Sequence, residues 1–546
     1  MPKTLLALLN REAGDARRDI LLAILVSSAA NTAILIVINH ASATIGSGAL
    51  NLQLLGFFLV AMALYVVGLR YTFDATTLIF EQMLDRIRVR MTERIAESEL
   101  LLLHQIGKPR IFQAITQDTA IISESQGLLV AAAHSVVMIV CTGVYVLTVS
   151  VPAFLTIVAV IVVGILLYLS RAQELGRLID ASIGEEVRVI GLIEDLIDGL
   201  KEIKLSHTRR IAVVKELSGV ADRLRDIKIR TAGVYNRNAV FSQCFFYVLL
   251  GVIVFVLPRV LTGFAPIASE LVATVLFIFG PISTIVTAIP AAAKADRAAA
   301  SLVALEAAID HVARSSGTAR PPRRLPFART IECRGIEFRY PGNDMGGFSI
   351  GPIDLSIRQG EITMFVGGNG SGKTTLLKVI AGLYPPTAGA LMIDGRPVPA
   401  GRLPNLREMI GAIFSDFHLF AKLYGVAAEE EAVVAQLDHM SIAHKVGYAD
   451  GAFTTRELST GQRKRVAMVV ALLEDRPVLI FDEWAAEQDP EFRRYFYEDL
   501  LPDLKRLGKT LLVATHDDRY FGIADTVVKM ELGRVQSVKQ RRRARA

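Results

Sequence analysis

Cysteine, tryptophan and charged residues are scarce in this 546-residue sequence. The three cysteines, Cys141, Cys244 and Cys333, have spacings that fit neither a metal site nor a disulfide framework, so we expect them to be packing residues. Charged residues make up 21% of the chain and apolar residues 52%, which lies on the apolar side of soluble proteins. Because typical domains run to roughly 100 to 200 residues, the length predicts two or three domains, and the composition predicts that one lies in lipid.

The net charge of +6 does not by itself indicate a nucleic-acid partner. Cytoplasmic loops of membrane proteins carry an excess of Lys and Arg, which explains a basic balance. The basic segment 539–546 is typical of a solvated tail, although such runs can also touch anionic lipid or RNA. We therefore predict no nucleic acid among the partners.

Six apolar runs with few or no charges lie in the first 300 residues. They are 20–39, 53–69, 127–148, 152–169, 240–257 and 271–292. Each is close to the ~20 residues that an α-helix needs to cross the hydrocarbon core of a bilayer. One such run could be a buried soluble helix, but six in succession favour a transmembrane domain, which we assign to 1–311. The first run is long enough to span, so we expect an uncleaved helix rather than a signal peptide.

The loops between these runs differ in charge. Two long loops, about 70–126 and 171–238, carry many Lys and Arg residues, whereas the short loops contain Arg259 as their only basic residue. The positive-inside rule then places both termini and both long loops in the cytoplasm. Apolar spacings of three and four residues predict helices in the long loops, and we expect their tips, near 108–114 and 204–210, to transmit motion from a partner domain.

Near residue 312 the composition changes to a polar, proline-rich stretch. It predicts a linker over 312–328. Beyond it, strand-like runs such as ITMFV and VLIFD alternate with helical stretches, which predicts an α/β domain with a largely parallel sheet over 329–538.

The segment GGNGSGKTT follows the strand ITMFV and precedes a helical run. It fits the phosphate-loop pattern G-x-x-x-x-G-K-[ST], in which backbone N–H groups and a helix N-terminus surround phosphate oxygens. We expect Lys373 to reach the β and γ phosphates of a nucleotide and the Thr374 hydroxyl to bind magnesium. The nucleotide contacts that this segment predicts are Gly367, Asn369, Gly370, Ser371, Gly372, Lys373, Thr374 and Thr375.

Two further segments complete the predicted chemistry. The apolar strand VLIFD ends in Asp482 and is followed by Glu483. Two carboxylates at a strand end could simply be solvated. Coming about 110 residues after a phosphate loop, they are better explained as a magnesium ligand acting through water, Asp482, and a base for the attacking water, Glu483. LSTGQRKR precedes a helix whose start could hold a phosphate near Ser459 and Gly461, although alone it is an ordinary polar helix start.

Together these segments resemble the nucleotide-binding domains of ATP-binding-cassette transporters. The phosphate loop, LSTGQ, VLIFDE and ATHDD occur in the family's order and approximate spacing. The resemblance implies that LSTGQ is the signature motif, whose Ser459, Gly461 and Gln462 complete the ATP site of the opposite subunit. It also implies the D-loop aspartate in Asp489 and the switch histidine in His516.

Tyr340, in FRYPG, matches the aromatic residue that stacks on adenine, while two positions depart from the family pattern. FSDFHLF places Ser415 where the family has the Q-loop glutamine. Asp416 follows it and is a candidate magnesium ligand beside Thr374 and Asp482, and which of the two residues replaces the glutamine stays open. Trp484 stands where a small residue usually follows the catalytic glutamate.

The strings FSDFHLF, LSTGQRKR and DEWAAEQDPEFRRYFY are similar to a bacterial subgroup of cyclic-peptide, lipopeptide and siderophore exporters. The resemblance implies an all-α six-helix transmembrane domain of the type IV exporter fold, followed by an α/β P-loop nucleotide-binding domain. It further implies an ATPase that uses ATP and Mg²⁺ to move a peptide-like or amphipathic compound across the bacterial inner membrane.

One phosphate loop and one signature motif in the same chain cannot close on each other in this family. We therefore expect a homodimer, with the bilayer and the cargo as further partners, that uses ATP-induced dimerisation and alternating access. Two alternatives remain: an importer with the same fold, and a soluble cassette ATPase that acts on nucleic acid. The sequence identifies neither the cargo nor the helix faces that line its path.

Overall fold

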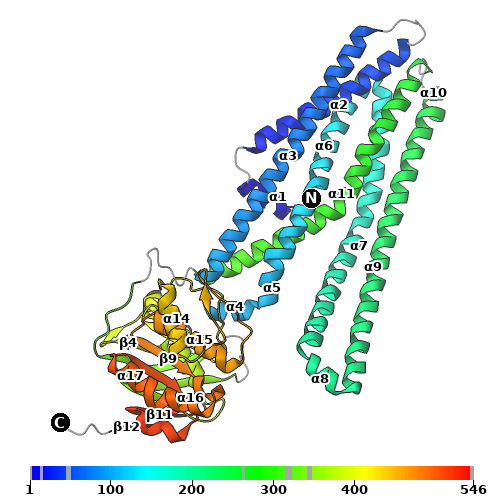
Figure 1. Ribbon diagram of the computed structural model, residues 1–546. Helices are drawn as coiled ribbons and strands as arrows, with labels where there is room; N and C mark the ends of the chain where they lie inside the picture. The colour runs from blue at the N-terminus through cyan, green and yellow to red at the C-terminus, as the bar shows by residue number, and fades with distance from the viewer. Residues whose placement is uncertain are drawn as a thin grey trace. The chain divides into compact units, whose positions relative to one another are not determined.

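The computed structural model divides the chain into two compact units, which we describe separately (Figure 1). The described residues are 3–12, 16–44, 51–260, 265–313, 323–340 and 347–541. The predicted linker 312–328 and tail 539–546 lie partly outside them. A helical unit contains 1–93 and 109–306, and a nucleotide-binding unit contains 94–108 and 307–546.

Helices of 10 to 49 residues build the helical unit. They are α1 (Lys3–Glu12), α2 (Ala16–Thr44), α3 (Leu52–Glu97), α6 (Thr119–Val149), α7 (Val151–Asp198), α9 (His207–Gly251) and α11 (Ala265–Ala313). Shorter helical segments between them are α5 (Lys108–Gln113), η2 (Ala114–Asp118), α8 (Leu200–Leu205), η3 (Val252–Val256) and α10 (Leu257–Val260).

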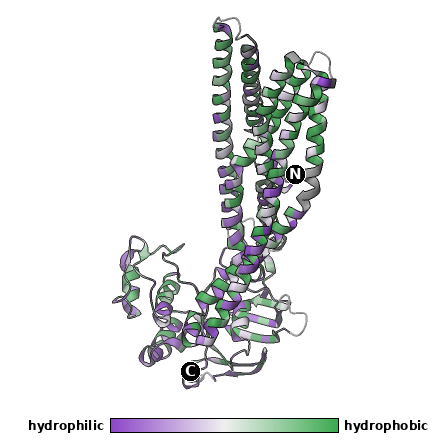
Figure 2. Cartoon of the chain, turned by 90° about the vertical axis from the view of Figure 1, so that its right-hand side faces the viewer, coloured by the Kyte–Doolittle hydropathy of each residue, from purple (hydrophilic) through white to green (hydrophobic). Residues whose placement is uncertain are grey.

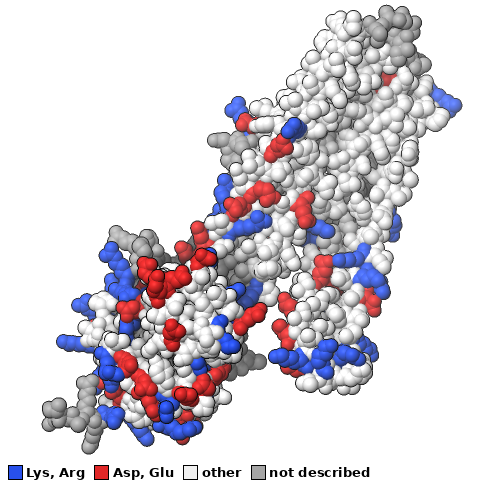
Figure 3. All heavy atoms as spheres, in the orientation of Figure 1, with Lys and Arg blue, Asp and Glu red and all other residues white. Residues whose placement is uncertain are grey.

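The six predicted apolar runs fall within α2, α3, α6, α7, α9 with η3 and the first residue of α10, and α11. Within the described residues, five helical stretches are long and apolar enough to cross a membrane, and Val151–Leu166 adds a shorter apolar stretch at the start of α7. Figure 2 shows hydrophobic residues along these stretches, and Figure 3 shows Lys and Arg gathered around the α8 end of the α7–α9 hairpin. The prediction of a helical membrane domain is confirmed.

Local sequence explains the tight connection between α6 and α7. The Ser150 side chain accepts a hydrogen bond from the backbone N–H of Ala153 at 3.4 Å, and Pro152 occupies the first turn of α7. Serine at an N-cap and proline in the first turn are both favoured there, because the serine oxygen satisfies a free N–H and proline lacks one. The short uncharged loop therefore starts a new helix at once.

Two main sheets form the nucleotide-binding unit. The larger has the order β12-β11-β3-β10-β9-β6: β12 (Arg534–Gln540), β11 (Thr526–Glu531), β3 (Ile362–Val366), β10 (Thr510–Ala514), β9 (Val478–Asp482) and β6 (Ile410–Ile413). All its pairings are parallel except that of β12 with β11. The smaller, antiparallel sheet has the order β2 (Ser349–Arg358), β1 (Thr330–Arg339), β4 (Ala388–Ile393) and β5 (Arg396–Pro397).

Helices and turns complete the unit. They are α4 (Leu100–Ile106), α12 (Lys373–Ile380), η4 (Ala400–Arg402), α13 (Leu403–Arg407), α14 (Glu430–His439), α15 (Thr460–Leu473), η5 (Trp484–Glu487), α16 (Pro490–Tyr495), η6 (Phe496–Leu500), α17 (Leu501–Arg506) and η7 (Asp518–Ile523), with a small β7 (Tyr448–Ala449) and β8 (Ala452–Phe453) hairpin. The predicted α/β domain is confirmed.

The register of the central strands positions the site. Every residue of β3, β9 and β10 is buried, as expected for parallel strands covered on both faces. Ala514 at the end of β10 pairs with Phe365 of β3 and with Asp482 of β9. The carboxyl ends of the three strands therefore meet at one edge, where Gly367, Glu483 and His516 follow, and ligands of such sheets bind at this edge.

Helix α4 belongs to the nucleotide-binding unit although it comes from the first long loop. Its residues Leu100 and Leu101 pack against the core that contains Tyr384 and Phe414. Glu99 lies 3.7 Å from Arg407 in an ion pair. Leu100 and Leu101, which pack against this core, therefore lie before the loop tip that we expected near 108–114.

Candidate nucleotide site

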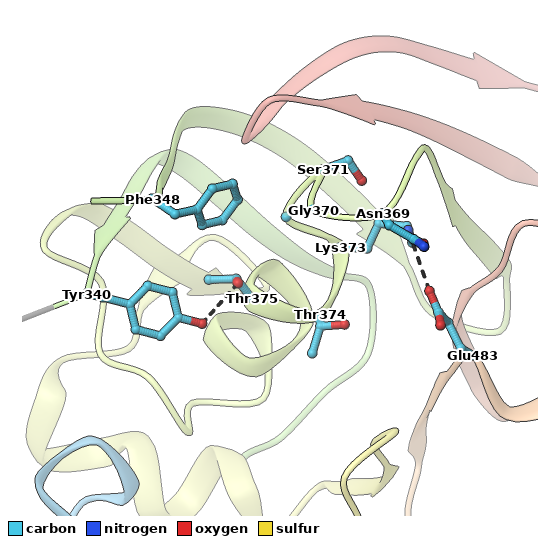
Figure 4. A pocket seen from close by; sticks show the side chains of 10 residues that line it. Tyr340, Phe348, Asn369, Gly370, Ser371, Lys373, Thr374, Thr375 and Glu483 are labelled. Carbon is cyan, nitrogen blue, oxygen red and sulfur yellow. Dashed lines mark hydrogen bonds and ion pairs between the residues drawn. The ribbon is translucent and has the colours of Figure 1, made fainter. Parts of the chain in front are cut away.

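The phosphate loop borders a hollow of about 300 Å³. It is lined by Tyr340, Phe348, Asn369, Gly370, Ser371, Gly372, Lys373, Thr374, Thr375 and Glu483. In Figure 4 the two aromatic rings lie on one side of the loop and Glu483 on the other. Gly372 has φ +100°, and a Cβ there would lie 2.8 Å from Ile350 Cγ2, so the turn into α12 requires glycine.

Lys373 supplies a buried positive charge to this hollow. Its Nζ donates to the carbonyl oxygens of Gly367 at 3.0 Å and Gly368 at 3.1 Å, and lies 3.7 Å from Glu483 Oε1. The side chain is 4% exposed, and burial lowers the pKa of Lys373. The buried hydroxyl of Ser371 has no hydrogen-bond partner among the described residues. A phosphate group would satisfy both side chains.

Thr374, Asp482 and Ser415 form the polar group next to the loop. Thr374 Oγ1 lies 3.0 and 2.9 Å from the two carboxylate oxygens of Asp482, and the Ser415 hydroxyl lies 3.3 Å from Asp482 Oδ2. Asp482 is 1% exposed, and burial raises its pKa. Asp416 instead accepts a hydrogen bond from Lys378 at 3.1 Å, with its side chain 64% exposed. The magnesium role of Asp416 stays a prediction.

Magnesium needs few protein ligands. It is usually bound by one or two carboxylates together with water and substrate phosphates. The described residues contain no cluster of three or more His, Cys, Asp or Glu side chains that could hold a metal by itself. Thr374 and the buried carboxylate of Asp482 suit an ion that is shared with a nucleotide.

Glu483 and His516 face each other beside Lys373. His516 Nε2 lies 2.7 Å from Glu483 Oε1 and 3.2 Å from Lys373 Nζ. Glu483 has φ +50°, a left-handed conformation that is unusual for a residue other than glycine, and its backbone N–H donates to Ala514 O at 3.0 Å. The arrangement brings the carboxylate of Glu483, the imidazole of His516 and the ammonium of Lys373 together at the carboxyl ends of the strands.

The aromatic side of the hollow contains one predicted residue and one that the sequence did not reveal. The Tyr340 hydroxyl lies 3.2 Å from Thr375 Oγ1, and its ring meets Phe338 and Tyr384 edge-on. Phe348 lines the same hollow but belongs to no motif. A single phenylalanine before a strand carries no signal for a nucleotide base.

A second hollow, of about 400 Å³, lies at the start of α15. It is lined by Ile442, His444, Ser459, Gly461, Gln462, Arg465, Glu487, Gln488 and Asp489. The Ser459 hydroxyl accepts from the Gln462 N–H at 3.4 Å, and the Gln462 side chain accepts from the Ser459 N–H at 3.1 Å, which is a capping box. The hollow is therefore lined by the capped N-terminus of α15.

Asp489 also lines this second hollow. It caps α16 by accepting from the Phe492 N–H at 2.8 Å, and this bond holds the pKa of Asp489 below its usual range. Ile442 and His444 were not expected, because they lie well before LSTGQ and match no motif. The two hollows share no lining residue.

Comparisons with known proteins agree with this geometry. Residues 350–486 match the ABC transporter family. The chain is 32% identical over 473 residues to the ATP-binding protein SyrD of Pseudomonas syringae pv. syringae, covering 84% of this chain and 83% of that protein. It is 31% identical over 240 residues to an ATP-dependent lipid A-core flippase of Paraburkholderia xenovorans, covering 42% and 40%.

Two further comparisons differ in how much of the chain they cover. A solved bacterial Atm1-family ABC exporter with ATP bound superposes with a TM-score of 0.79 over 98% of this chain and 96% of that one, at 16% identity, which concerns the fold alone. A methionine import ATP-binding protein, MetN of Corynebacterium efficiens, is 33% identical but covers only 38% of this chain. The match to this importer component is therefore confined to part of the chain, whereas the match to SyrD extends over most of it.

Proposed function

We propose that this chain, which belongs to the ABC transporter family, is an ATP-driven exporter and that its cargo is a peptide-like or amphipathic compound. We further propose that it works as a homodimer in the bacterial inner membrane, with both termini in the cytoplasm. The basic residues of the long loops support this orientation.

The proposal of a homodimer rests on the two separate hollows. One contains the phosphate loop and Glu483, and the other contains the start of α15. In this family a bound nucleotide is enclosed by the phosphate loop of one subunit and the signature motif of the other. Since both hollows are intact here, two copies of the chain would form two equivalent ATP sites.

At each site the residues take distinct roles. Lys373 and the phosphate-loop N–H groups bind and orient the phosphates of ATP. Thr374 and Asp482 would hold Mg²⁺, which would neutralise charge on the phosphate oxygens. Glu483 accepts the proton of the attacking water, and His516, 2.7 Å from it, orients that carboxylate and contacts the γ-phosphate. Tyr340 and Phe348 contact the adenine ring of ATP.

The nature of the cargo is supported by the helical unit. Its apolar membrane-crossing stretches contain few charged side chains. A compound with apolar groups suits a path between such helices better than a highly charged solute. The similarity to the lipopeptide and siderophore exporter subgroup points the same way.

A transport assay tests cargo and direction together. Proteoliposomes with the nucleotide-binding units outside would receive a fluorescent lipopeptide and MgATP in the outer solution. We expect ATP-dependent accumulation inside the vesicles with the natural chain, and none with the Glu483→Gln variant. ATP-dependent loss of preloaded lipopeptide would indicate import, and no movement of lipopeptides or siderophores in either direction would reject the proposed cargo.

The dimer is tested separately. The Glu483→Gln chain in lipid nanodiscs should form dimers of its nucleotide-binding units at saturating MgATP, seen as efficient transfer between fluorophores on the two copies. Persistence of monomers under these conditions would reject the two-chain site.

A further inference from the structure

Two buried side chains make hydrogen bonds between α15 and the turn that carries Glu483. Lys464, on α15, donates from Nζ to the backbone oxygen of Glu483 at 2.9 Å. Trp484, which follows Glu483, donates from Nε1 to the backbone oxygen of Lys464 at 3.0 Å. Lys464 is 2% exposed and Trp484 1% exposed. The pair therefore joins the helix after the signature motif to the turn that carries the proposed base.

The backbone at Glu483 needs such support. Its conformation, φ +50° and ψ +35°, is strained for a glutamate and persists only where the surroundings enforce it. The Glu483 carbonyl accepts from Lys464 and, at 3.3 Å, from the Ala486 N–H. Fixing this carbonyl fixes ψ of Glu483, and with it the direction in which the carboxylate leaves the chain toward His516.

Both Lys464 and Trp484 belong to segments that are packed in the core of the unit. α15 packs Val466, Met468 and Val469 fully into the core of the unit. The Trp484 ring stacks on Phe496 with ring centres 4.6 Å apart. Glu487 balances the buried ammonium of Lys464 at 3.5 Å. A catalytic group is held best by neighbours whose own conformations are locked by packing.

We propose that Lys464 and Trp484 are positioning residues for ATP hydrolysis. They hold the peptide between Glu483 and Trp484 against α15, so that the Glu483 carboxylate faces the phosphate loop. This explains why a large indole occupies a position where the family usually has a small residue: its N–H makes the second hydrogen bond between the turn and α15. The inference rests on the proposed role of Glu483 as the base.

The test uses the full chain in lipid nanodiscs, with kcat and KM for ATP, the affinity for a fluorescent ATP analogue and thermal unfolding all measured. Lys464→Met keeps the length of the side chain but removes the donor, and Trp484→Phe keeps the ring stacking but removes the N–H. The matched control is Lys509→Met, which removes a lysine paired with Asp475 at the opposite ends of the strands.

We expect Lys464→Met to lower kcat by about 10- to 100-fold while KM and analogue affinity change less than about twofold, because only the orientation of the base is lost. Trp484→Phe should lower kcat by about two- to fivefold, and the double variant should fall little below Lys464→Met, since both side chains join the same turn to α15. Lys509→Met should leave kcat unchanged.

Contrary results have separate meanings. A Lys464→Met chain with the kcat of the Lys509→Met control overturns the inference, as does an equal fall of kcat, analogue affinity and thermal stability, which marks a purely structural role. If Lys464→Met does not fold, an unchanged kcat in Trp484→Phe overturns it. Undiminished turnover in Glu483→Gln overturns the proposed base, and the positioning role falls with it.

Discussion

The two units bury polar side chains in opposite ways. In the nucleotide-binding unit the buried polar groups include charges, Lys373, Asp482 and Lys464, which converge on Glu483 and its neighbours. In the helical unit the buried polar groups are mostly neutral hydroxyls and amides, such as Thr142 and Thr274 on different helices, with Asp118 and His134 as exceptions. Convergent buried charge indicates chemistry, whereas scattered hydroxyls indicate helix packing.

The difference follows from the free energy of burial. An ionised side chain loses far more hydration than a hydroxyl when it leaves water, so buried charges persist where partners and a function hold them. A hydroxyl on a membrane helix can bond to the carbonyl one turn earlier, as Thr274 does to Glu270 O at 2.8 Å. Substitutions should therefore change ATP turnover strongly in one unit and weakly in the other.

The largest effect should come from Glu483→Gln. The amide cannot accept the proton of water, so we expect ATPase kcat to fall at least about 100-fold while ATP binding persists. Glu498→Gln, an exposed change on η6 of the same unit, is the matched control and should leave kcat unchanged. The measurement is steady-state phosphate release with parallel analogue binding. If both variants hydrolysed ATP at the natural rate, the base would lie elsewhere.

Gly461→Ala should have the next largest effect, and it acts on the second hollow. A Cβ on Gly461 would lie 2.6 Å from the carbonyl oxygen of Glu487, so that segment must shift. We expect kcat to fall about 10-fold or more, with analogue binding at the phosphate loop retained. Gly522→Ala, whose Cβ meets nothing within 4 Å, is the control. Equal activity of both variants would mean that the second hollow takes no part.

The site was largely predictable because its key segments are contiguous. GGNGSGKTT contains both the glycines and the lysine of the loop, and its geometry is local. The residues that sequence reasoning missed, Phe348 and His444, reach their hollows only through the tertiary fold. The sequence also could not choose between Ser415 and Asp416, since adjacent residues point in different directions according to the packing of Lys378.

The choice between these neighbours provides the third test. Ser415→Ala removes the hydroxyl 3.3 Å from Asp482 Oδ2, so the Mg²⁺ concentration for half-maximal ATPase activity should rise about 10-fold. Asp416→Asn keeps an oxygen for Lys378 and should change that concentration less than about twofold. Titration of ATPase activity with Mg²⁺ measures both. The reverse order of effects would make Asp416 the magnesium ligand.

The helical unit was predictable in layout but not in contacts. Length and lack of charge locate its helices, because the bilayer imposes both. They do not say which helix faces meet, since small and polar residues on several faces pack equally well in lipid. The bond from Asn39 on α2 to Thr274 on α11, 3.3 Å long, joins segments 235 residues apart and leaves no pattern in the sequence.

That bond allows the smallest effect to be tested. Thr274→Val keeps the shape of a fully buried side chain but removes the acceptor for Asn39. Bonds of this kind between membrane helices contribute about 0.6 kcal/mol, so thermal stability should fall slightly while basal ATPase activity stays within about twofold. Thr284→Val, on the same helix, removes only a bond to Gly280 O and controls for the loss of a hydroxyl. A large loss of ATPase activity in Thr274→Val alone would show that this contact is coupled to the nucleotide site, and the contrast between the two units would no longer hold.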